Sequence, residues 1–529
     1  MKRDRIFSVL LLPLFGVLAS CGGGGDSGGS GGGGNGGFPT PTTTWKSGVF
    51  QPSASFDAKC VSPRAGTSDR LGTVTDQNNW LRSWTNELYL WYSEVPDLDP
   101  SLYTTDAYFK LLKTGATTNS GAPKDKFHFV YPTDVWEALS QGGIEAGFGA
   151  EFAVLAPTPP RRIVVAFTDP NTPAASNLAR GDEILTVDGV DAVNGNTQAI
   201  VDVLNAGLFP DATGESHVFS VRNTAGVTRS VTMVSATITH KPVPIVTTFD
   251  NGTVGYIQFN DHIATAEKQL IDAVDTLKAG GGVTDLILDL RYNGGGYLDL
   301  ASELAYMVGN TSMLTGKTFE KIVFNDKNPS RNPVTGEILT PTPFYDKTQG
   351  FPGTAAGTAL PTLDLLKVYV ITGPGTCSAS ESVINSLRGA GIQVYLIGST
   401  TCGKPYGFYP ADNCGTTYFS IQFRGENNAN FGDYTDGFSP ANTGANAGTT
   451  VAGCSVADDF THPMGDASEG RIAAALSFRA SGNLTCPAAS GASAPPQLAK
   501  SSISGEPEDR SRWVSKPAAR QNRIIRRMQ

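Results

Sequence analysis

The sequence predicts an α/β protein, and three observations carry that prediction. Between residues 243 and 487, strand-like apolar runs alternate with amphipathic helix-like runs, which is typical of a layered α/β architecture. Residues 135–242 hold short β-rich runs around one helical piece, which indicates a separate β domain. Residues 50–134 carry bulky apolar side chains at helical spacing between Trp80 and Tyr92, so we expect a small helical domain there.

The alternation in residues 243–487 assigns each element in turn. Apolar runs of strand length are bounded by turn residues, and the longer runs between them place apolar side chains three and four residues apart. The expected strands are 255–259, 286–290, 368–372 and 394–397, and the expected helices are 264–277, 299–308 and 380–388.

The N-terminus reads as an export signal. Basic residues precede an apolar run from Ile6 to Ala19, which is shorter than the roughly 20 residues that a membrane span needs. Leu18-Ala19-Ser20-Cys21 resembles the lipobox of bacterial lipoproteins, which implies removal of residues 1–20 and lipidation of Cys21. The alternative is an ordinary signal peptide whose exit ends in cysteine. We expect a chain anchored to the cell envelope that faces the periplasm or the exterior, and Gly22 favours the outer membrane.

Two further segments lack the composition of a packed core. Residues 21–49 are rich in Gly, Ser and Pro and predict a tether, whereas residues 488–529 predict a solvated basic tail. The net charge of -9 argues against nucleic acid as a partner. The histidines show no metal-ligand spacing, so we expect neither metal nor cofactor: they are His128, His217, His240, His262 and His462.

Six cysteines remain after Cys21, and an even number in an exported chain suggests disulfides. Fifteen pairings are open. Cys402 with Cys414 is the pair we favour, because the residues between them read as a hairpin-like loop.

The chemistry concentrates at the ends of two expected strands. Ser378 lies in a short turn between the strand 368–372 and the helix 380–388, and Lys404 follows the strand 394–397. This arrangement predicts a serine nucleophile with lysine as its general base. A lysine is a base only when neutral, so burial must lower its pKa from about 10.4.

Three consecutive glycines, Gly294 to Gly296, close the strand 286–290. Glycine permits the close approach of a ligand, so an amide of Gly294 or Gly295 could face a developing oxyanion. The amide of Ala379 is the expected second donor.

The segment 398–404 also fits the first positions of a phosphate-binding loop. Pro405 replaces the hydroxyl residue that ligates magnesium, and the following residues cannot begin the required helix. We therefore reject nucleotide binding.

Within residues 135–242, the run from Thr168 to Gly189, with Arg180-Gly181-Asp182 at its centre, resembles a bacterial PDZ domain. Gly147, Phe148, Gly149 and Ala150 match the loop that binds a peptide carboxylate in that module. The resemblance implies that a peptide adds as a strand to the adjacent sheet edge. A structural β module with a blocked groove is the alternative.

The ordered set Leu-Asp-Leu-Arg-x-Asn-Gly-Gly, Ser-Ala-Ser-Glu and Gly-Lys behind this module resembles the S41 peptidases, the C-terminal processing or tail-specific proteases. The resemblance implies a crotonase-like core of repeated ββα units, with Ser378 as nucleophile and Lys404 as base. It also implies an oxyanion hole formed by Gly294 or Gly295 with Ala379.

Tail-specific members carry glutamine four residues after the lysine, where this chain has Phe408. The third catalytic member stays open among Ser380, Glu381 and Asn293, and His262 is an alternative base to Lys404. The expected function is a lipid-anchored serine endopeptidase that acts on peptides or unfolded proteins. The alternative is a binding lipoprotein for peptides or apolar ligands on the same scaffold, without proteolysis.

Overall fold

The computed structural model describes residues 45–444, 448–487 and 523–524, so the predicted signal, Cys21 and most of the tether lie outside the described residues. Contacts between residues divide the chain after Thr44, and every described residue belongs to the unit that begins at Trp45. Within the described ranges, no helix combines the length and apolar character needed to cross a bilayer.

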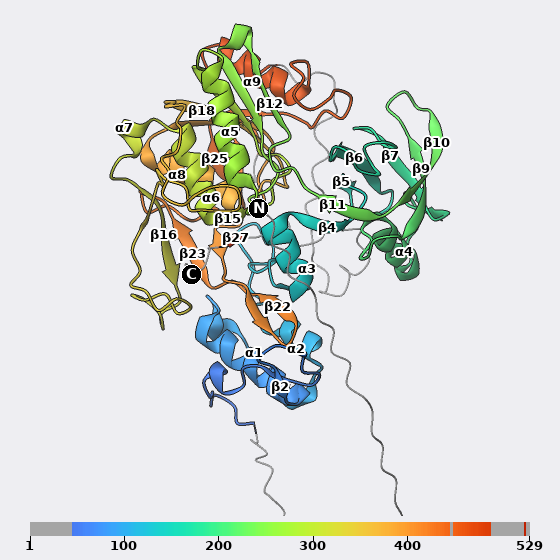
Figure 1. Ribbon diagram of the computed structural model, residues 1–529, viewed down its shortest axis with the longest axis vertical. Coiled ribbons are helices and arrows are strands. Elements are labelled where there is room, and N and C mark those ends of the chain that lie inside the picture. The colour runs from blue at the N-terminus through green and yellow to red at the C-terminus, as the bar shows by residue number, and fades with distance from the viewer. Residues whose placement is uncertain (1–44, 445–447, 488–522, 525–529) are drawn as a thin grey trace, which may run out of the picture. The chain divides into compact units, whose positions relative to one another are not determined.

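A six-stranded sheet lies at the centre of the C-terminal half (Figure 1). β12 pairs antiparallel with β13, and the remaining neighbours pair in parallel. The four strands expected from the sequence are confirmed to within one residue at each end. In sheet order the strands are β12 (Ile245–Phe249), β13 (Val254–Gln258), β14 (Asp285–Asp289), β18 (Lys367–Thr372), β19 (Gln393–Gly398) and β26 (Gly453–Ser455).

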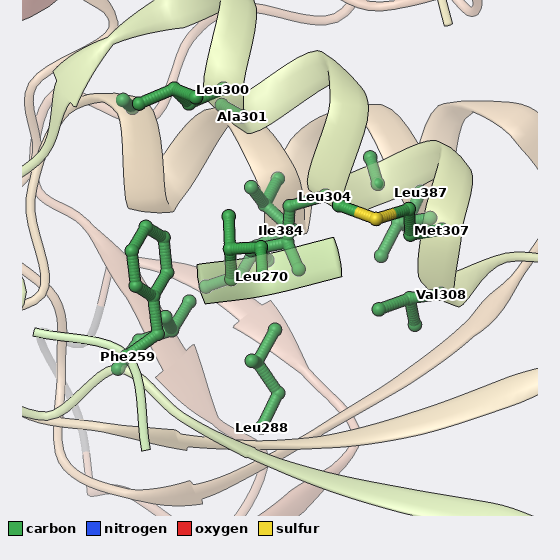
Figure 2. Close-up of a cluster of buried hydrophobic side chains, with 14 of the residues drawn as sticks. Phe259, Leu270, Leu288, Leu300, Ala301, Leu304, Met307, Val308, Ile384 and Leu387 are labelled. Atoms are coloured by element: carbon green, nitrogen blue, oxygen red, sulfur yellow. The ribbon is translucent and has the colours of Figure 1, made fainter. Parts of the chain in front are cut away.

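Helices cover both faces of this sheet because its strands are apolar on both sides. Alternate residues of β14 belong to different clusters, Leu286 and Leu288 to one and Ile287 to the other. The first cluster packs against α5 (Ala266–Ala279), α6 (Leu298–Val308) and α8 (Ala379–Ala390), as Figure 2 shows for Leu288 and the side chains of these helices. The second packs against α9 (Gly470–Ala480).

Residues 144–239 form the β-rich domain, which has a hydrophobic cluster of its own. Its six-stranded sheet has the order β10-β9-β7-β6-β5, with β8 beside β7. α4 (Gln198–Leu208) begins after Thr197, whose hydroxyl accepts a bond from the amide of Ile200. The α/β core and the separate β domain expected from the sequence are thus confirmed. The strands are β4 (Ile144–Gly147), which pairs with β11 (Ala236–Thr239), and β5 (Ala150–Ala156), β6 (Arg162–Thr168), β7 (Glu183–Val187), β8 (Val190–Asp191), β9 (Ser216–Arg222) and β10 (Thr228–Val234).

The N-terminal region contains α1 (Val74–Leu88) and α2 (Thr105–Leu111). A reciprocal capping box of Thr73 and Asp76 starts α1 earlier than the aromatic pattern indicated. The region is not purely helical, since it also holds β1 (Lys59–Cys60), β2 (Arg70–Leu71) and β3 (Phe129–Pro132). β3 pairs with β22 (Thr416–Phe419), which joins this region to the C-terminal half.

The disulfides correct one sequence-based prediction. Cys402 pairs with Cys377 rather than with Cys414, and Cys414 pairs with Cys60 across 354 residues. The third bridge joins Cys454 to Cys486. The stretch between Cys402 and Cys414 is not the expected hairpin, since Tyr406–Gly407 pairs with the strand Phe423–Glu426 and Ala411–Asn413 pairs with β22. Cys414 instead lies at the turn before β22, which pairs with β3 of the N-terminal region.

The remaining elements are short and complete the surroundings of the central sheet. Strands β17, β16, β23 and β20 form one small sheet, and β21, β22 and β3 form another. The bounds are α3 (Thr133–Glu137), α7 (Thr311–Leu314), β15 (Gly296–Tyr297), β16 (Thr318–Phe324), β17 (Thr342–Pro343), β20 (Tyr406–Gly407), β21 (Ala411–Asn413), β23 (Phe423–Glu426), β24 (Phe438–Pro440), β25 (Thr449–Val451) and β27 (Arg523–Ile524).

Candidate active site

The three sequence motifs meet at one edge of the central sheet. β14, β18 and β19 are adjacent parallel strands, and the last residues of β18 and β19, Thr372 and Gly398, are register partners. The loops that follow these strands therefore leave the sheet side by side. They carry the glycine run, Ser378 and Lys404.

Ser378 connects its strand to α8 through an unusual backbone conformation. Its φ is 62° and its ψ is -116°, in a region that L-residues rarely occupy. Such strain costs about 1–3 kcal/mol and collects at functional sites, as in the sharp strand-to-helix turns that present nucleophiles. The Ser378 side chain is fully buried, and its Oγ has no hydrogen-bond partner among the described residues.

Lys404 is fully buried in an aromatic environment. Its Nζ lies 4.5 Å from the ring centroid of Phe408 and 4.8 Å from that of Phe127. Phe408, which stands where tail-specific peptidases have glutamine, is thus a wall of the lysine pocket. The sequence could not indicate Phe127, since it lies far from Lys404 along the chain.

The Glu381 carboxylate holds the two loops to each other. One oxygen, Oε2, accepts hydrogen bonds from the amides of Ser378 (3.0 Å) and Lys404 (2.8 Å). The other, Oε1, accepts from the amide of Gly403 (2.8 Å) and from the hydroxyl of Thr401. Burial raises the pKa of Glu381, and these four hydrogen bonds oppose the rise. Glu381 therefore positions the backbone of both predicted catalytic residues.

The Cys377–Cys402 disulfide reinforces the same junction. Cys377 immediately precedes Ser378, and Cys402 lies two residues before Lys404, with a Cα–Cα distance of 5.2 Å. Our sequence reasoning missed this pair. The sequence signal that could have indicated this disulfide is that each of its cysteines lies next to or within two residues of a predicted catalytic residue.

The glycine run packs directly against Ser378. Gly295 has a φ of 96°, and a Cβ built on it would lie 2.8 Å from both the Ala379 nitrogen and the Ser378 Cβ. The Gly295 amide donates to Asn293 Oδ1 at 2.9 Å, so it is already engaged. This leaves Gly294 and Ala379, of the three residues expected from the sequence, for the role of oxyanion donors.

Asn293 and Ser380 support this arrangement through contacts between the glycine loop and α8. The Asn293 carbonyl accepts bonds from the Cys377 amide (3.0 Å) and the Ser380 hydroxyl (3.1 Å). Its side-chain Nδ2 donates to the Phe259 carbonyl at 3.0 Å. Both residues therefore tie the glycine loop to the start of α8, in a positioning role.

His262 lies on the opposite side of the glycine run from α8. Its Nδ1 is 2.9 Å from Asn293 Oδ1, and complete burial lowers its pKa to about 3. The imidazole is therefore neutral near pH 7. Its Nε2 is buried without a hydrogen-bond partner among the described residues, beside a cavity that Gly295 and Gly296 also line.

Residues 253–407 match the family model described as peptidase family S41, and this stretch includes all three motifs. The chain carries an S41 peptidase domain. The match supports a peptidase function for the site.

One solved structure supports the fold, and two others are reported only as similar chains. A putative S41 protease from Bacteroides fragilis NCTC 9343 has a TM-score of 0.56 and 21% identity, covering 77% of this chain and 98% of that one. The photosystem II D1 C-terminal processing protease has a TM-score of 0.41 and 20% identity, covering 70% and 92%. A peptide-bound PDZ domain of a Vibrio cholerae carboxy-terminal protease has a TM-score of 0.15 and 23% identity, covering 18% and 97%. No curated protein sequence matches the chain.

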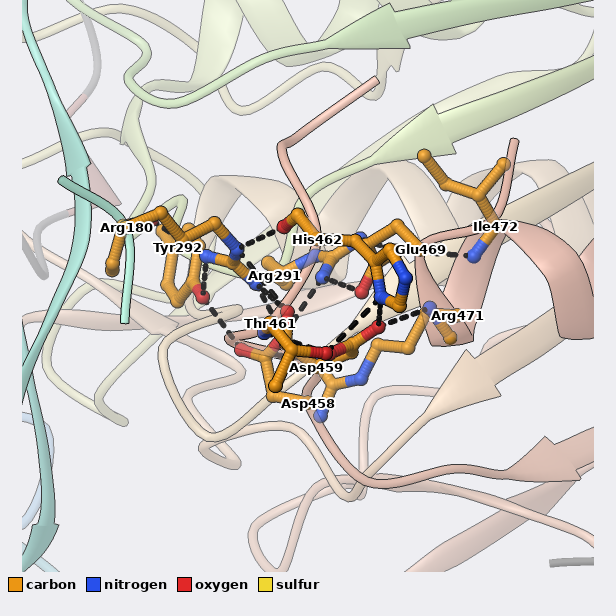
Figure 3. A network of polar contacts seen from close by, with 12 residues as sticks. Arg180, Arg291, Tyr292, Asp458, Asp459, Thr461, His462, Glu469, Arg471 and Ile472 are labelled. Atoms are coloured by element: carbon orange, nitrogen blue, oxygen red, sulfur yellow. Dashed lines mark hydrogen bonds and ion pairs between the residues drawn. The ribbon is translucent and has the colours of Figure 1, made fainter. Parts of the chain in front are cut away.

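A buried charge network joins the β domain to the S41 domain (Figure 3). Arg291, which follows β14, contacts Asp289 (2.8 Å), Asp458 (2.8 Å) and Glu469 (2.7 Å). Arg180 of the β domain also contacts Asp458, at 2.9 Å, and donates to the Tyr292 hydroxyl. Burial alone would raise the pKa of Asp458, but the nearby guanidinium groups lower it below its usual range. Asp458 is thus an ion-pair partner rather than an acid–base group.

In the β domain, the loop Gly147–Ala150 joins β4 to β5 through Gly149, whose φ is 74°. The Phe148 side chain is buried in the hydrophobic cluster of that domain. Among the described residues, β5 has a strand partner on one side only, β6, so its other edge is the one that a peptide strand would join.

Among the described residues, one His/Cys/Asp/Glu group has the spacing of a metal site: Cys377, Glu381 and Cys402. The two sulfurs are bonded to each other, and the carboxylate accepts the four hydrogen bonds given above. This group therefore serves as a cross-link of the S41 site.

Proposed function

We propose that the chain is a serine endopeptidase in which Ser378 is the nucleophile and Lys404 the general base. The observation that carries the proposal is the Glu381 carboxylate, which binds the backbone amides of both residues. A single buried anchor fixes the distance between the two loops, as catalysis by proximity requires. The strained backbone of Ser378 and the burial of Lys404 support the same roles.

In the proposed reaction, Ser378 Oγ bonds to the substrate carbonyl carbon while its proton passes to the neutral Lys404 amine. The amides of Gly294 and Ala379 donate to the oxyanion, and the N-terminus of α8 adds its positive field. The C–N bond breaks as Lys404 returns the proton to the leaving amine. Water then attacks the carbonyl carbon of the Ser378 ester and gives one proton to Lys404, which passes it to Ser378 Oγ as the ester C–O bond breaks, so both side chains return to their starting state.

We further propose that the loop Gly147–Ala150 and the open edge of β5 hold a substrate strand or its C-terminal carboxylate. Paired addition to a sheet edge gives affinity without sequence preference, which suits exported or unfolded protein substrates.

The cell-envelope location and the lipid anchor at Cys21 also remain proposals, since that residue lies outside the described ranges. Three disulfides in the described residues support an oxidising compartment.

The test replaces Ser378 by Ala and Lys404 by Met and measures cleavage of an unfolded casein reporter. Ser386→Ala is the matched control, because it removes another buried hydroxyl from α8 away from the site. We expect both site variants to lose at least about 10³-fold in kcat while the control keeps its activity. Equal cleavage by Ser378→Ala and the unmodified chain would refute the proposal and leave the scaffold a binding protein.

A further inference from the structure

The N-terminal region holds a group of exposed apolar side chains. Fifteen large apolar side chains are exposed among the described residues, and seven of them lie between Trp45 and Leu111. Single exposed apolar residues are common on soluble proteins, whereas a group of them marks an interaction surface. The seven are Trp45, Val49, Val61, Leu71, Val74, Leu102 and Leu111, and the exposed fractions of Leu71 and Leu102 are 81% and 73%.

One side of α1 organises five of these side chains. Val74, Asn78 and Arg82 follow one another at four-residue spacing, so they lie on the same side of the helix. Val74 is exposed, whereas Asn78 and Arg82 are buried. Other segments of the chain therefore cover this side of α1 beyond its first turn.

The turn that contains Leu102 covers α1 at Asn78. The Asn78 Nδ2 donates to the carbonyls of Pro100 and Tyr103, at 2.8 and 2.9 Å. These two residues flank Leu102, and α1 lies on their inner side. The exposed side chain of Leu102 therefore points away from the helix.

The first described segment covers α1 one turn further on. Arg82 donates to the carbonyls of Val49 and Lys46, at 3.0 and 3.3 Å. Trp45 and Val49 are exposed on the outer side of this segment. Leu71 lies just before the start of α1 and continues the exposed surface beyond Val74.

We call these five residues the apolar face: Trp45, Val49, Leu71, Val74 and Leu102. Figure 1 shows α1, α2 and β2 of this region together at the lower end of the ribbon.

The place where the described chain begins indicates what covers the apolar face. Trp45, a member of the face, follows the proposed lipid attachment at Cys21 by 24 positions. A chain of that length reaches about 85 Å at most. An acylated Cys21 would therefore confine the apolar face to a thin layer above a bilayer, where it meets lipid at a high effective concentration.

The chemistry of the apolar face fits the interfacial layer of a bilayer. Tryptophan is enriched at the level of the lipid headgroups, and leucine and valine side chains bury in the acyl boundary beneath them. Lys46 and Arg70 are exposed beside Trp45 and Leu71, where cations suit lipid phosphates. An anchor alone limits the distance to the membrane, whereas a second contact also fixes the orientation of the body.

We propose that the apolar face is a membrane-contact surface, which seats the N-terminal region on the headgroup layer of a phospholipid bilayer. The contact is separate from the proposed peptidase activity and holds the body in one orientation on the membrane. It does not require the acyl groups, so it can be measured without them.

The test measures co-sedimentation of residues 22–529, made without acylation, with vesicles of phosphatidylcholine and phosphatidylethanolamine. Removal of residues 1–21 leaves the described unit complete, because that unit begins at Trp45. Anionic lipid is left out so that the basic residues in 500–527 contribute little to binding.

The test variant combines Leu71→Asp with Leu102→Asp. The matched control combines Ile338→Asp with Leu366→Asp, which changes two apolar side chains of the S41 domain that are 66% and 61% exposed. Melting temperatures show whether each variant is folded, and Leu71→Ser with Leu102→Ser replaces the test variant if the aspartates prevent folding.

We expect the unmodified chain and the control to have the same lipid partition coefficient, and the test variant to lose at least about tenfold. Casein cleavage in solution should be the same in all of them. Equal partition coefficients for the test variant and the control overturn the inference, as does an unmodified chain that binds no vesicles.

Two further outcomes separate this inference from its neighbours. A dimer in light scattering that the test variant abolishes, without vesicle binding by the unmodified chain, overturns the inference and makes the face an interface between two copies. Vesicle binding that depends on Leu71 and Leu102 supports the inference even if mass spectrometry finds Cys21 without acyl groups, in which case only the proposed anchor fails.

Discussion

The substitution Glu381→Gln tests how the two catalytic loops are held. Glutamine keeps the shape of glutamate but retains only one acceptor oxygen, whereas the carboxylate now serves four donors. The least costly orientation keeps that oxygen toward the amides of Ser378 and Lys404. The amide nitrogen then faces Thr401, whose hydroxyl can turn to accept, and the amide of Gly403, which loses its acceptor.

The magnitude follows from that one lost acceptor. A buried backbone donor without a partner costs about 1–3 kcal/mol. If the loop that carries Gly403 moves so that its amide finds another acceptor, Lys404 shifts relative to Ser378. We then expect the free energy of activation for peptide cleavage to rise by a similar amount. We therefore expect kcat to fall about 5- to 150-fold, since each 1.4 kcal/mol is worth about tenfold.

The assay is steady-state cleavage of casein with kcat and KM measured separately, together with the melting temperature of each variant. Glu337→Gln, which changes an exposed carboxylate elsewhere, controls for the loss of charge. We expect KM to change little, because Glu381 is buried behind the loops rather than in contact with substrate. A Glu381→Gln protein that keeps its full kcat would refute the positioning role.

Three further predictions follow from other contacts. Replacing both Cys377 and Cys402 by Ser should lower kcat about tenfold and lower the free energy of unfolding by about 3 kcal/mol. Replacing both Cys60 and Cys414 by Ser should lower the melting temperature and leave kcat unchanged. Equal losses of kcat in the two double variants would contradict this prediction. Burial and a hydrogen bond with Glu267 raise the pKa of Glu303 to about 10, so the stability that protonated Glu303 contributes is complete below its ordinary pKa of about 4.5 and is lost as pH rises toward 10. The melting temperature of the Ser378→Ala chain should therefore fall between pH 5 and 9, and Glu303→Gln should make that fall smaller. An equal fall in the Glu303→Gln variant would exclude Glu303 as its source. A peptide with a free C-terminal carboxylate should bind the β domain about tenfold more tightly than its amidated form in fluorescence anisotropy, and equal affinities would argue against carboxylate capture by the loop Gly147–Ala150.

The sequence predicted secondary structure most accurately in the central sheet, where the apolar pattern of each strand directly reflects its burial. The central strands are buried on both faces, so they read as continuous apolar runs, and β14 and β19 lie within one residue of their predicted bounds. The helix expected at 264–277 is α5 (Ala266–Ala279), and that at 380–388 is α8 (Ala379–Ala390).

Long-range contacts were beyond sequence pattern alone. The Cys60–Cys414 bridge depends on the pairing of β3 with β22, which no local signal specifies. The contact of the Phe127 ring with Lys404 is likewise between residues far apart along the chain, and no local sequence signal specifies it. The sequence did name Glu381 as a candidate third member, but its contact with both loops required the register of β18 and β19.

The most direct measurement of the central claim is covalent labelling by a fluorophosphonate, followed by peptide mapping. We expect the adduct on Ser378, at a rate that rises with pH in the unmodified chain and shows no such rise in Lys404→Met. An adduct on another residue, or the same rate and pH dependence without the Lys404 amine, would contradict a serine activated by lysine.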